Sequence, residues 1–296
     1  MILHMYNNLT KSDICCLIIS YNPDDNIFQL IKTLEHQVAY LIIVDNNSRE
    51  DKRIALSEFI KSREVKLIIN NTNRGVAAAL NQGIHEAKLN KYKWIITFDQ
   101  DTKSSNRIIE YICEVYNSYS QKERVGMIGV NYPDLNTRNF KKFSVEQKYL
   151  LKDYLITSGT LLNIQAFDEV GEFREDFFID NVDLEYSLRL REHGKVLLVT
   201  SKIGMVHRPG NPKIKRRTWF SINSSNHVPF RRYFMARNHI ILSRLYLLKF
   251  PVFIIKLNFF FILSFISMLF LEKDLKEKLL ATLKGIHAGF KEKALM

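Results

Sequence analysis

WIITFDQDT, residues 94–102, places two carboxylates at the end of an apolar run. Its first half is an apolar run rich in Ile, typical of a buried strand, and its second half is a polar loop. Asp99 and Asp101 stand one residue apart in that loop. Two carboxylates this close repel each other unless a positive charge lies between them. They can hold a metal ion, cap a helix or point into water, and the rest of the sequence has to separate these cases.

The same pattern of an apolar run followed by a polar loop is found four times in the first hundred residues. The runs are ICCLIIS (14–20), LIIVD (41–45), VKLII (65–69) and WIITFD (94–99). Segments of helical period come between them, so the pattern predicts βαβ units and a parallel sheet covered by helices on both faces. In such sheets ligands bind beyond the carboxyl ends of the strands. The polar residues at those ends therefore predict one shared binding cluster.

The composition indicates a globular protein. The chain has 296 residues, of which 46% are hydrophobic and 12% aromatic, which is ample for a sizeable core. Its three cysteines have no spacing typical of a zinc site and are too few for a disulfide framework. The N-terminal residues lack the pattern of a signal peptide. We therefore expect a cytoplasmic protein.

The net charge of +12 is concentrated in one region. Residues 208–271 contain eleven Lys and Arg and no Asp or Glu. The second half of this region is also the most apolar part of the chain, with LNFFFILSFISMLFL at 257–271. A solvated nucleic-acid-binding face does not carry so much Phe and Leu. The charge pattern therefore argues against a nucleic-acid partner.

Six motifs in order resemble the family 2 glycosyltransferases of the GT-A fold, most closely the bacterial rhamnosyltransferase-like members. The resemblance covers about residues 12–240, and its motifs are SYN, VDNNS, NRGVAAALNQGI, FDQDT, TSGTLLN and FFIDNVDLEYSLRLREHG. It implies an α/β GT-A fold whose sheet becomes mixed in the acceptor half. We expect residues 1–240 to form this catalytic domain and residues 241–296 a C-terminal helical extension. The implied reaction is an inverting sugar transfer from a nucleotide diphosphate to a hydroxyl.

The resemblance assigns the donor-binding residues. Asp45 would read the base of the nucleotide, although DNNS also favours a turn in which Asp45 bonds the backbone. Arg74 would face the nucleotide from the start of a helix, where backbone N–H groups favour anions. A plain helix start explains Gly75 equally well. The other expected contacts to the nucleotide sugar are Ser20, Tyr21, Asn22, Asn73, Asp99, Ser158 and Gly159.

A divalent metal, Mn²⁺ or Mg²⁺, is expected on the donor diphosphate. One or two carboxylates suffice to hold such an ion against phosphate oxygens, and Asp99 and Asp101 fit that task. By resemblance Asp101 touches the metal and Asp99 also lies near the ribose, while His207, 24 residues after Asp183, completes the metal ligands. An Asx turn with a helix cap near Asn106 is the alternative for the two aspartates. The DxDxT loop of haloacid-dehalogenase phosphatases does not fit the register.

The general base is expected in the second half of the chain. An inverting transfer needs a carboxylate to take the proton of the acceptor hydroxyl, and Asp180, Asp183 and Glu185 are the candidates. In many relatives a Glu-Asp pair precedes Arg189 by seven and six positions, and the Asp is the base. Here Val182 and Asp183 stand there, so Asp183 is selected by resemblance. Helix capping by Asp180, with a Glu185 and Arg189 pair, is the alternative.

The apolar run at 257–271 is about fifteen residues long, which is short for a helix that crosses a bilayer. With its flanking Lys and Arg it predicts contact with an anionic membrane surface, on the inner face of the cell membrane. The alternative is a helical hairpin packed on the catalytic domain or on a second subunit.

The sequence leaves the sugar and the acceptor open. The resemblance favours rhamnose from dTDP-L-rhamnose and a lipid-linked glycan acceptor in the synthesis of a cell-surface polysaccharide such as O-antigen or capsule. UDP-sugar transferases, for galactofuranose or glucose, use the same scaffold. A catalytically silent nucleotide-sugar binder is the alternative outside the enzymes.

Overall fold

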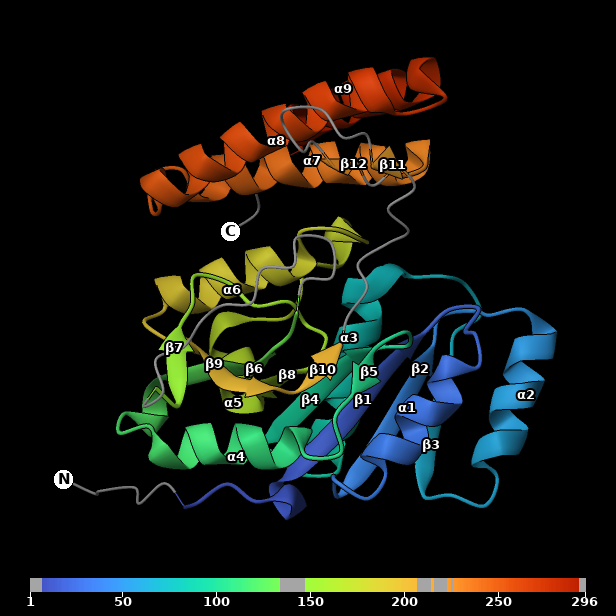
Figure 1. Ribbon diagram of the computed structural model, residues 1–296, viewed down its shortest axis with the longest axis vertical. Helices are drawn as coiled ribbons and strands as arrows, with labels where there is room; N and C mark the ends of the chain where they lie inside the picture. The colour runs from blue at the N-terminus through green and yellow to red at the C-terminus, as the bar shows by residue number, and fades with distance from the viewer. Residues whose placement is uncertain (1–6, 134–146, 207–213, 216–222, 225, 293–296) are drawn as a thin grey trace. The chain divides into compact units, whose positions relative to one another are not determined.

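The computed structural model describes residues 7–133, 147–206, 214–215, 223–224 and 226–292 (Figure 1). Within these ranges the chain separates into two compact units. The first consists of Met1–Asp176 and Tyr186–Arg208, and the second of Phe177–Glu185 and Pro209–Met296. The predicted domain boundary at 240/241 lies inside a helix, α7 (Pro229–Tyr246), and stays a prediction.

The first unit is built on an eight-stranded sheet in the order β3-β2-β1-β4-β8-β6-β9-β7. Strands β1 to β4 are parallel to one another, as the four apolar runs predict. Strand β8 runs antiparallel to both β4 and β6, so the sheet becomes mixed, as expected. The strands are β1 (Ile14–Ser20), β2 (Tyr40–Asp45), β3 (Val65–Ile69), β4 (Trp94–Asp99), β6 (Val125–Asn131), β7 (Tyr149–Leu151), β8 (Thr160–Asn163) and β9 (Val196–Ile203).

Helices cover both faces of this sheet (Figure 1). Alternate residues of β1, namely Ile14, Cys16 and Ile18, share a core with the apolar sides of α1 and α4. Leu17 points the other way, and a Cβ on Gly83 of α3 would lie 2.4 Å from it. Strand β1 is therefore buried on both faces. The helices of this unit are α1 (Asn26–Leu34), α2 (Glu50–Ile60), α3 (Gly75–Leu89), α4 (Ile108–Ser118) and α5 (Ile164–Val170), with the short η1 (Lys11–Asp13), η2 (Lys122–Arg124) and η3 (Glu175–Phe177).

Two short strands lie outside the main sheet of the first unit. β5 (Lys103–Ser104) pairs antiparallel with β10 (Met205–Val206). β5 directly follows the loop that holds Asp99 and Asp101. The pairing therefore fixes the far end of that loop.

The second unit consists mainly of three helices, α7, α8 (Pro251–Leu271) and α9 (Leu275–Lys291), with a small hairpin of β11 (Ile214–Lys215) and β12 (Asn223–Ser224). α9 approaches α7 closely, because a Cβ on Gly285 would lie 2.3 Å from the Tyr233 carbonyl oxygen. Between them a buried Glu272 is paired with Arg232 and, at 3.0 Å, with Lys278. Buried charges need such partners.

Helix α6 (Val182–Glu192) belongs to both units. Its first turn, up to Glu185, is counted with the second unit, and the rest with the first. The predicted general base is on this first turn.

Helix α8 is longer than the sequence argument allowed. It has 21 residues, and its apolar window has a mean hydropathy of 2.2, so its length and composition suffice to cross a membrane. The apolar run at 257–271 is only part of this helix, because the helix already begins at Pro251, a residue suited to a first helical turn, and continues through Lys256.

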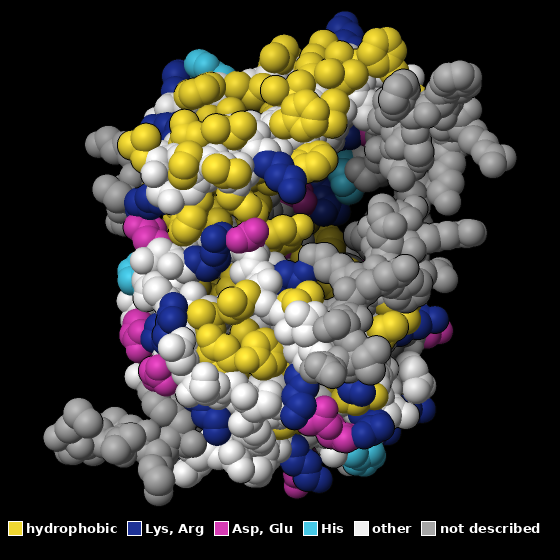
Figure 2. All heavy atoms as spheres, turned by 60° about the vertical axis from the view of Figure 1, so that its left-hand side comes forward, with side chains coloured by type: hydrophobic (Ala, Val, Ile, Leu, Met, Phe, Trp, Pro, Cys, Tyr) yellow, Lys and Arg dark blue, Asp and Glu magenta, His cyan; other side chains and the backbone are white. Residues whose placement is uncertain are grey.

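The surface of α8 is strongly apolar. Hydrophobic side chains gather on the helices at the top of Figure 2. Those of α8 that are exposed are Val252, Ile255, Phe259, Phe260, Ile262, Leu263, Ile266 and Phe270. The one amide side chain of the helix, Asn258, instead faces α7, where its Oδ1 lies 2.7 Å from His239 Nε2. α8 therefore has its polar contact inside and its apolar residues outside, the reverse of a helix that packs on a soluble core.

Candidate active site

The carboxyl ends of β1, β2 and β4 meet at one edge of the sheet. Ser20, the last residue of β1, is the register partner of Asp45, and Ile19 is the partner of Asp99. Because neighbouring strands lie about 4.8 Å apart, the loops after these strands converge. The edge brings together three of the predicted donor-side residues: Ser20, Asp45 and Asp99.

Ser20 is fully buried, and its hydroxyl has no hydrogen-bond partner among the described residues. A buried polar group without a partner is uncommon, and it is expected to have a partner in the functional state. An unpaired hydroxyl at the end of a central strand is an observation that fits a polar ligand at this edge.

Asp45 is buried and forms the turn that DNNS predicts. Its Oδ1 accepts from the Ser48 N–H at 2.8 Å and its Oδ2 from the Ser48 hydroxyl at 2.5 Å. The Ser48 hydroxyl also accepts from the Asn22 N–H at 2.7 Å, which joins the loops after β1 and β2. Each carboxylate oxygen keeps a second lone pair. The turn is therefore observed, and recognition of a base by Asp45 stays a prediction.

A cluster of amide side chains shapes the loop before α3. The Asn46 amide donates to Asn73 Oδ1 at 2.9 Å and to the Gly75 carbonyl at 3.0 Å. Its oxygen accepts from the Arg74 N–H at 3.0 Å and from the Asn70 amide at 3.1 Å. These bonds hold Gly75 at φ +85°, a left-handed conformation that glycine adopts without strain. Asn46 and Asn70 were missed by sequence reasoning, although Asn-rich strand ends were a visible signal.

The Arg74 side chain has a protein partner. Its guanidinium lies 3.2 Å from the Glu175 carboxylate, and both side chains are about half exposed. Glu175 was not predicted from the sequence. A contact between Arg74 and the nucleotide stays a prediction, and it would have to compete with this ion pair.

The loop with the two aspartates is held by its backbone. The Asp99 N–H donates to the Ser158 hydroxyl at 3.1 Å, and the Gly159 N–H donates to the Thr97 carbonyl at 2.8 Å. Gly159 is in the left-handed region, and a Cβ there would lie 2.5 Å from Met205 Sδ. Ser158 and Gly159 therefore lie directly beside Asp99, as the predicted site requires.

Gln100 fastens this loop to the loop after β1. Its Oε1 accepts from the Tyr21 N–H at 2.7 Å, and its Nε2 donates to the Tyr21 carbonyl at 3.0 Å. Sequence reasoning passed over Gln100 because it treated the residue between the two aspartates as a spacer.

Helix capping does not account for Asp99 and Asp101. α4 begins only at Ile108, and the Arg107 N–H in front of it donates to the Ser105 hydroxyl at 3.2 Å. Asp101 is exposed. The two aspartates thus stand at and just after the carboxyl end of β4 and do not cap α4, and their role in ligand binding stays a prediction.

The donor set for a metal is small in the described part of the chain. No group of three or more His, Cys, Asp or Glu side chains comes together there. His207, the predicted third ligand, lies outside the described residues. Two carboxylates at a strand end still fit a divalent ion, because Mg²⁺ is commonly held by one or two carboxylates with substrate phosphates and water.

The three acceptor-side candidates lie in the second unit and differ in their surroundings. Glu185 is buried, and its Oε1 accepts from the Tyr246 hydroxyl at 2.9 Å. Asp180 forms a two-pronged ion pair with Arg231, with contacts of 2.8 and 2.9 Å. Asp183 is half-buried, and its Oδ1 accepts from the Leu184 N–H at 2.9 Å. Two of the three carboxylates thus have a side-chain donor from α7.

Comparison with known proteins agrees with this geometry. Residues 15–170 match the sequence profile described as glycosyl transferase family 2. The chain is 31% identical to the dTDP-rhamnosyl transferase RfbF of Shigella flexneri over 79% of this chain and 81% of that protein. It is 22% identical to the poly-beta-1,6-N-acetyl-D-glucosamine synthase of Staphylococcus epidermidis over 60% of this chain and 46% of that protein.

Solved structures share the fold. GalNAc-T7 with UDP, GalNAc and Mn²⁺ matches with a TM-score of 0.58 at 14% identity, over 81% of this chain and 48% of that chain. S. aureus TarS 1–349 in complex with UDP matches with a TM-score of 0.52 at 11% identity, over 95% of this chain and 72% of that chain. The present chain thus spans about half the length of the GalNAc-T7 structure.

Proposed function

The chain belongs to the family 2 glycosyltransferases, with the GT-A fold, and from this premise we propose that it transfers rhamnose from dTDP-L-rhamnose to a hydroxyl of a lipid-linked glycan. That the chain is a nucleotide-sugar transferase follows from its family. The choice of rhamnose is supported by the 31% identity to a dTDP-rhamnosyl transferase over most of both chains. The pathway we propose is the synthesis of a cell-surface polysaccharide, O-antigen or capsule.

The proposed donor site is supported by the arrangement of residues at the edge where β1, β2 and β4 end. Ser20, Asp45 and Asp99 stand on neighbouring strand ends there, and the Ser20 hydroxyl is buried without a partner among the described residues. Open α/β sheets bind nucleotides at this edge. We assign the nucleotide to the loops after these strands, with Tyr21, Asn22, Asn73, Arg74 and Gly75 beside it.

Asp99 and Asp101 would hold a divalent ion, Mn²⁺ or Mg²⁺, with His207 as a further ligand. Such an ion neutralises charge on the diphosphate leaving group. Asp99 is suited to this role because Ser158 and Gly159 fix its backbone. The solved structure of GalNAc-T7, which shares this fold, contains Mn²⁺, and this supports a divalent ion in the present chain.

Asp183 would act as the general base. As the acceptor oxygen forms its bond to the anomeric carbon of the sugar, the bond from that carbon to the diphosphate breaks and dTDP leaves. The hydroxyl proton passes to the Asp183 carboxylate. Asp183 is favoured because it stands six positions before Arg189, where the resemblance places the base, and because Glu185 is buried against Tyr246.

Helix α8 would attach the enzyme to the inner face of the cell membrane, where a lipid-linked acceptor is found. Apart from Lys256 its exposed residues are apolar, and its polar Asn258 faces α7. Lys249 and Lys256 add positive charge, which suits an anionic leaflet. The alternative cover for this surface is a second copy of the chain.

A donor screen tests the proposal. Purified protein is incubated with dTDP-L-rhamnose, UDP-galactofuranose, UDP-glucose and membrane vesicles from cells lacking the chain, and release of dTDP or UDP is followed. We expect dTDP release from dTDP-L-rhamnose. Release of UDP alone would assign the enzyme to UDP-sugars. Binding of a donor without release of any nucleotide would identify a silent nucleotide-sugar binder.

A further inference from the structure

The segment that leads into α6 has a strained backbone. Phe178, Asp180 and Asn181 have φ values of +57°, +63° and +61°. Positive φ is uncommon for residues other than glycine and is unfavourable without supporting contacts. Three such residues within four positions persist only where surrounding contacts hold them. The segment ends at Val182, so its shape sets the direction in which Asp183 enters the helix.

One side chain of α7 supplies those contacts. The Asn238 Nδ2 lies 2.8 Å from the Phe177 carbonyl oxygen, 2.9 Å from that of Ile179 and 2.9 Å from that of Asp180. Asn238 is fully buried. A buried amide nitrogen whose two hydrogens face three carbonyl oxygens of one short loop has little freedom to move. Asn238 therefore fixes the segment just before the proposed base.

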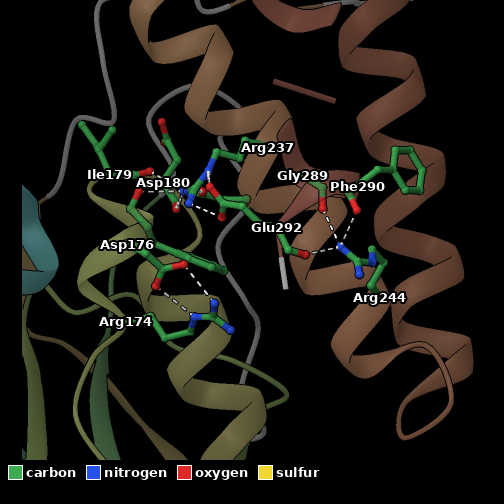
Figure 3. A network of polar contacts seen from close by, with 11 residues as sticks. Arg174, Asp176, Ile179, Asp180, Arg237, Arg244, Gly289, Phe290 and Glu292 are labelled. Atoms are coloured by element: carbon green, nitrogen blue, oxygen red, sulfur yellow. Dashed lines mark hydrogen bonds and ion pairs between the residues drawn. The ribbon is translucent and has the colours of Figure 1, made fainter. Parts of the chain in front are cut away.

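The orientation of Asn238 is set from its other side. Arg237 Nη1 donates to Asn238 Oδ1 at 2.7 Å, so the amide oxygen faces the guanidinium and the NH₂ group faces the loop. Arg237 is itself buried, and its Nε donates to Glu292 Oε1 at 2.8 Å while its Nη2 pairs with the other carboxylate oxygen. Figure 3 shows these contacts at the end of α9.

The end of α9 cannot move away without disturbing this chain of contacts. A Cβ on Gly289 would lie 2.7 Å from the Arg237 carbonyl oxygen, so the two helices touch through their backbones at this point. Arg244, two turns further along α7, donates to the carbonyls of Gly289 and Glu292 at 2.7 and 2.8 Å. Arg244 holds the same end of α9, but among the described residues its hydrogen bonds go to backbone carbonyls of that end and not to Asn238.

We propose that Asn238 is a positioning residue for Asp183, and that Glu292 and Arg237 hold Asn238 in the orientation it needs. This inference rests on the proposed role of Asp183 as the base. The C-terminal helices then have a second task besides membrane contact, because they keep the acceptor-side loop in its strained, catalytically useful shape.

The test compares five variants of the full-length chain, one of which, Glu292→Asp, keeps the charge that Glu292→Gln removes. Asn238→Asp has nearly the same shape but turns an oxygen toward three carbonyl oxygens. Glu292→Gln removes the charge that holds Arg237. Arg244→Lys is the matched control at the same end of α9, and Asp183→Asn reports on the base itself. Turnover of dTDP-L-rhamnose with membrane vesicles gives kcat and the donor KM, and thermal unfolding reports folding.

We expect Asn238→Asp to lower kcat about 10²-fold with an unchanged donor KM, the size of effect that a misplacement of about 1 Å produces. Glu292→Gln should lower kcat in the same direction by a smaller factor, and Glu292→Asp should restore part of it. Arg244→Lys should lower the unfolding temperature and leave kcat unchanged. If Asn238→Asp does not fold, the inference is tested by the other pair: kcat should fall in Glu292→Gln and recover in part in Glu292→Asp.

Two results would overturn the inference. Equal kcat losses in Glu292→Gln and Arg244→Lys, each in step with the loss of stability, would mean that these residues only stabilise the helices. Full activity of Glu292→Gln together with folded, fully active Asn238→Asp would mean the loop needs no such support. If Asp183→Asn is itself fully active, the proposed base is wrong, and that failure is seen separately.

Discussion

The Tyr246 hydroxyl donates a hydrogen bond to Glu185 Oε1 across 2.9 Å, and both residues are buried. A buried carboxylate that already accepts such a bond is poorly placed to meet an incoming acceptor. We therefore expect Glu185 to have a structural role in the second unit, and the two aspartates are the stronger candidates for the base.

Tyr246→Phe tests this relationship. Hydrogen bonds to charged groups contribute about 1.5–3 kcal/mol, so the variant should lose an unfolding free energy of this order. Its kcat should change little, because no step of the reaction uses Glu185. Urea unfolding and turnover are the two measurements. A large kcat loss at unchanged stability would return Glu185 to the list of candidate bases.

The proposed metal predicts a dependence on divalent ions. EDTA should abolish transfer, and Mn²⁺ or Mg²⁺ should restore it, because the leaving diphosphate would otherwise keep its charge unscreened. Asp101→Ala should be nearly inactive and still folded, since its side chain is exposed and removes no core packing. Full turnover in EDTA contradicts the metal assignment.

Stability should fall as the medium becomes acidic. Burial, together with the charge of Arg231, lowers the pKa of His227 from 6.5 to about 4, and burial lowers the pKa of His239 as well. The unfolded chain therefore binds more protons, so the stability from these groups is fully present above about pH 6.5 and is lost as the pH falls toward 4.

Variants of the two histidines separate their contribution to the loss of stability from that of the carboxylates, which also take up protons at acidic pH. His227→Gln and His239→Gln should each show a flatter fall of the urea midpoint between pH 6.5 and 4.5 than the parent chain. Equal slopes in parent and variants would show that neither histidine is held neutral by the fold.

The parallel half of the sheet could be predicted from the sequence because its signal is local. Runs such as ICCLIIS and WIITFD indicate a buried strand from no more than seven consecutive residues. The polar residues after them indicate the edge of the sheet where a ligand is expected. The mixed half is different, since β8 is placed between β4 and β6 by pairing across long stretches of chain. Only the family resemblance predicted it.

The donor-side aspartates could be identified, but their partners could not. Asn46 contacts Asn73 across 27 residues, and Gln100 contacts Tyr21 across 79. The same limit applies to Asn238, which reaches the loop before α6 across about 60 residues. Periodicity reports which face of an element is buried, and it carries no information on which distant side chain completes a polar contact.

The apolar face of α8 should determine membrane binding. Ile255, Phe259 and Phe270 are 61%, 57% and 78% exposed, so replacing all three by Ser removes apolar surface without creating a cavity. We expect the triple variant to lose most of its co-sedimentation with anionic vesicles and to keep its unfolding free energy.

Ile254, which is fully buried, provides the control for α8. Ile254→Ala should cost about 2–5 kcal/mol of stability and leave vesicle binding intact. If the triple Ser variant instead changes from dimer to monomer with unaltered vesicle binding, the cover of α8 is a second copy of the chain. Deletion of the residues after 248 would be a poorer test, because it also removes α9 and its contacts with α7.

The base itself is tested by Asp183→Asn with Asp180→Asn as its control. Asn keeps the size of Asp but cannot take a proton near neutral pH, so Asp183→Asn should lower kcat by about 10²-fold to 10⁴-fold, with donor affinity nearly unchanged. Asp180 is at φ +63°, a conformation that Asn tolerates well, so Asp180→Asn keeps the loop and weakens only the ion pair with Arg231.

That second variant should therefore lose about 0.2–1 kcal/mol of stability and little activity. Measured kcat and donor affinity of both variants distinguish the cases, since each carboxylate is removed without a change of shape. An inactive Asp180→Asn beside an active Asp183→Asn would move the base three residues earlier and would mean that the Arg231 pair opens during the reaction. If both variants are fast, neither aspartate takes the proton. The base is then Glu185, which would have to leave its contact with Tyr246, or the reaction follows an acceptor-assisted route that needs no side-chain base.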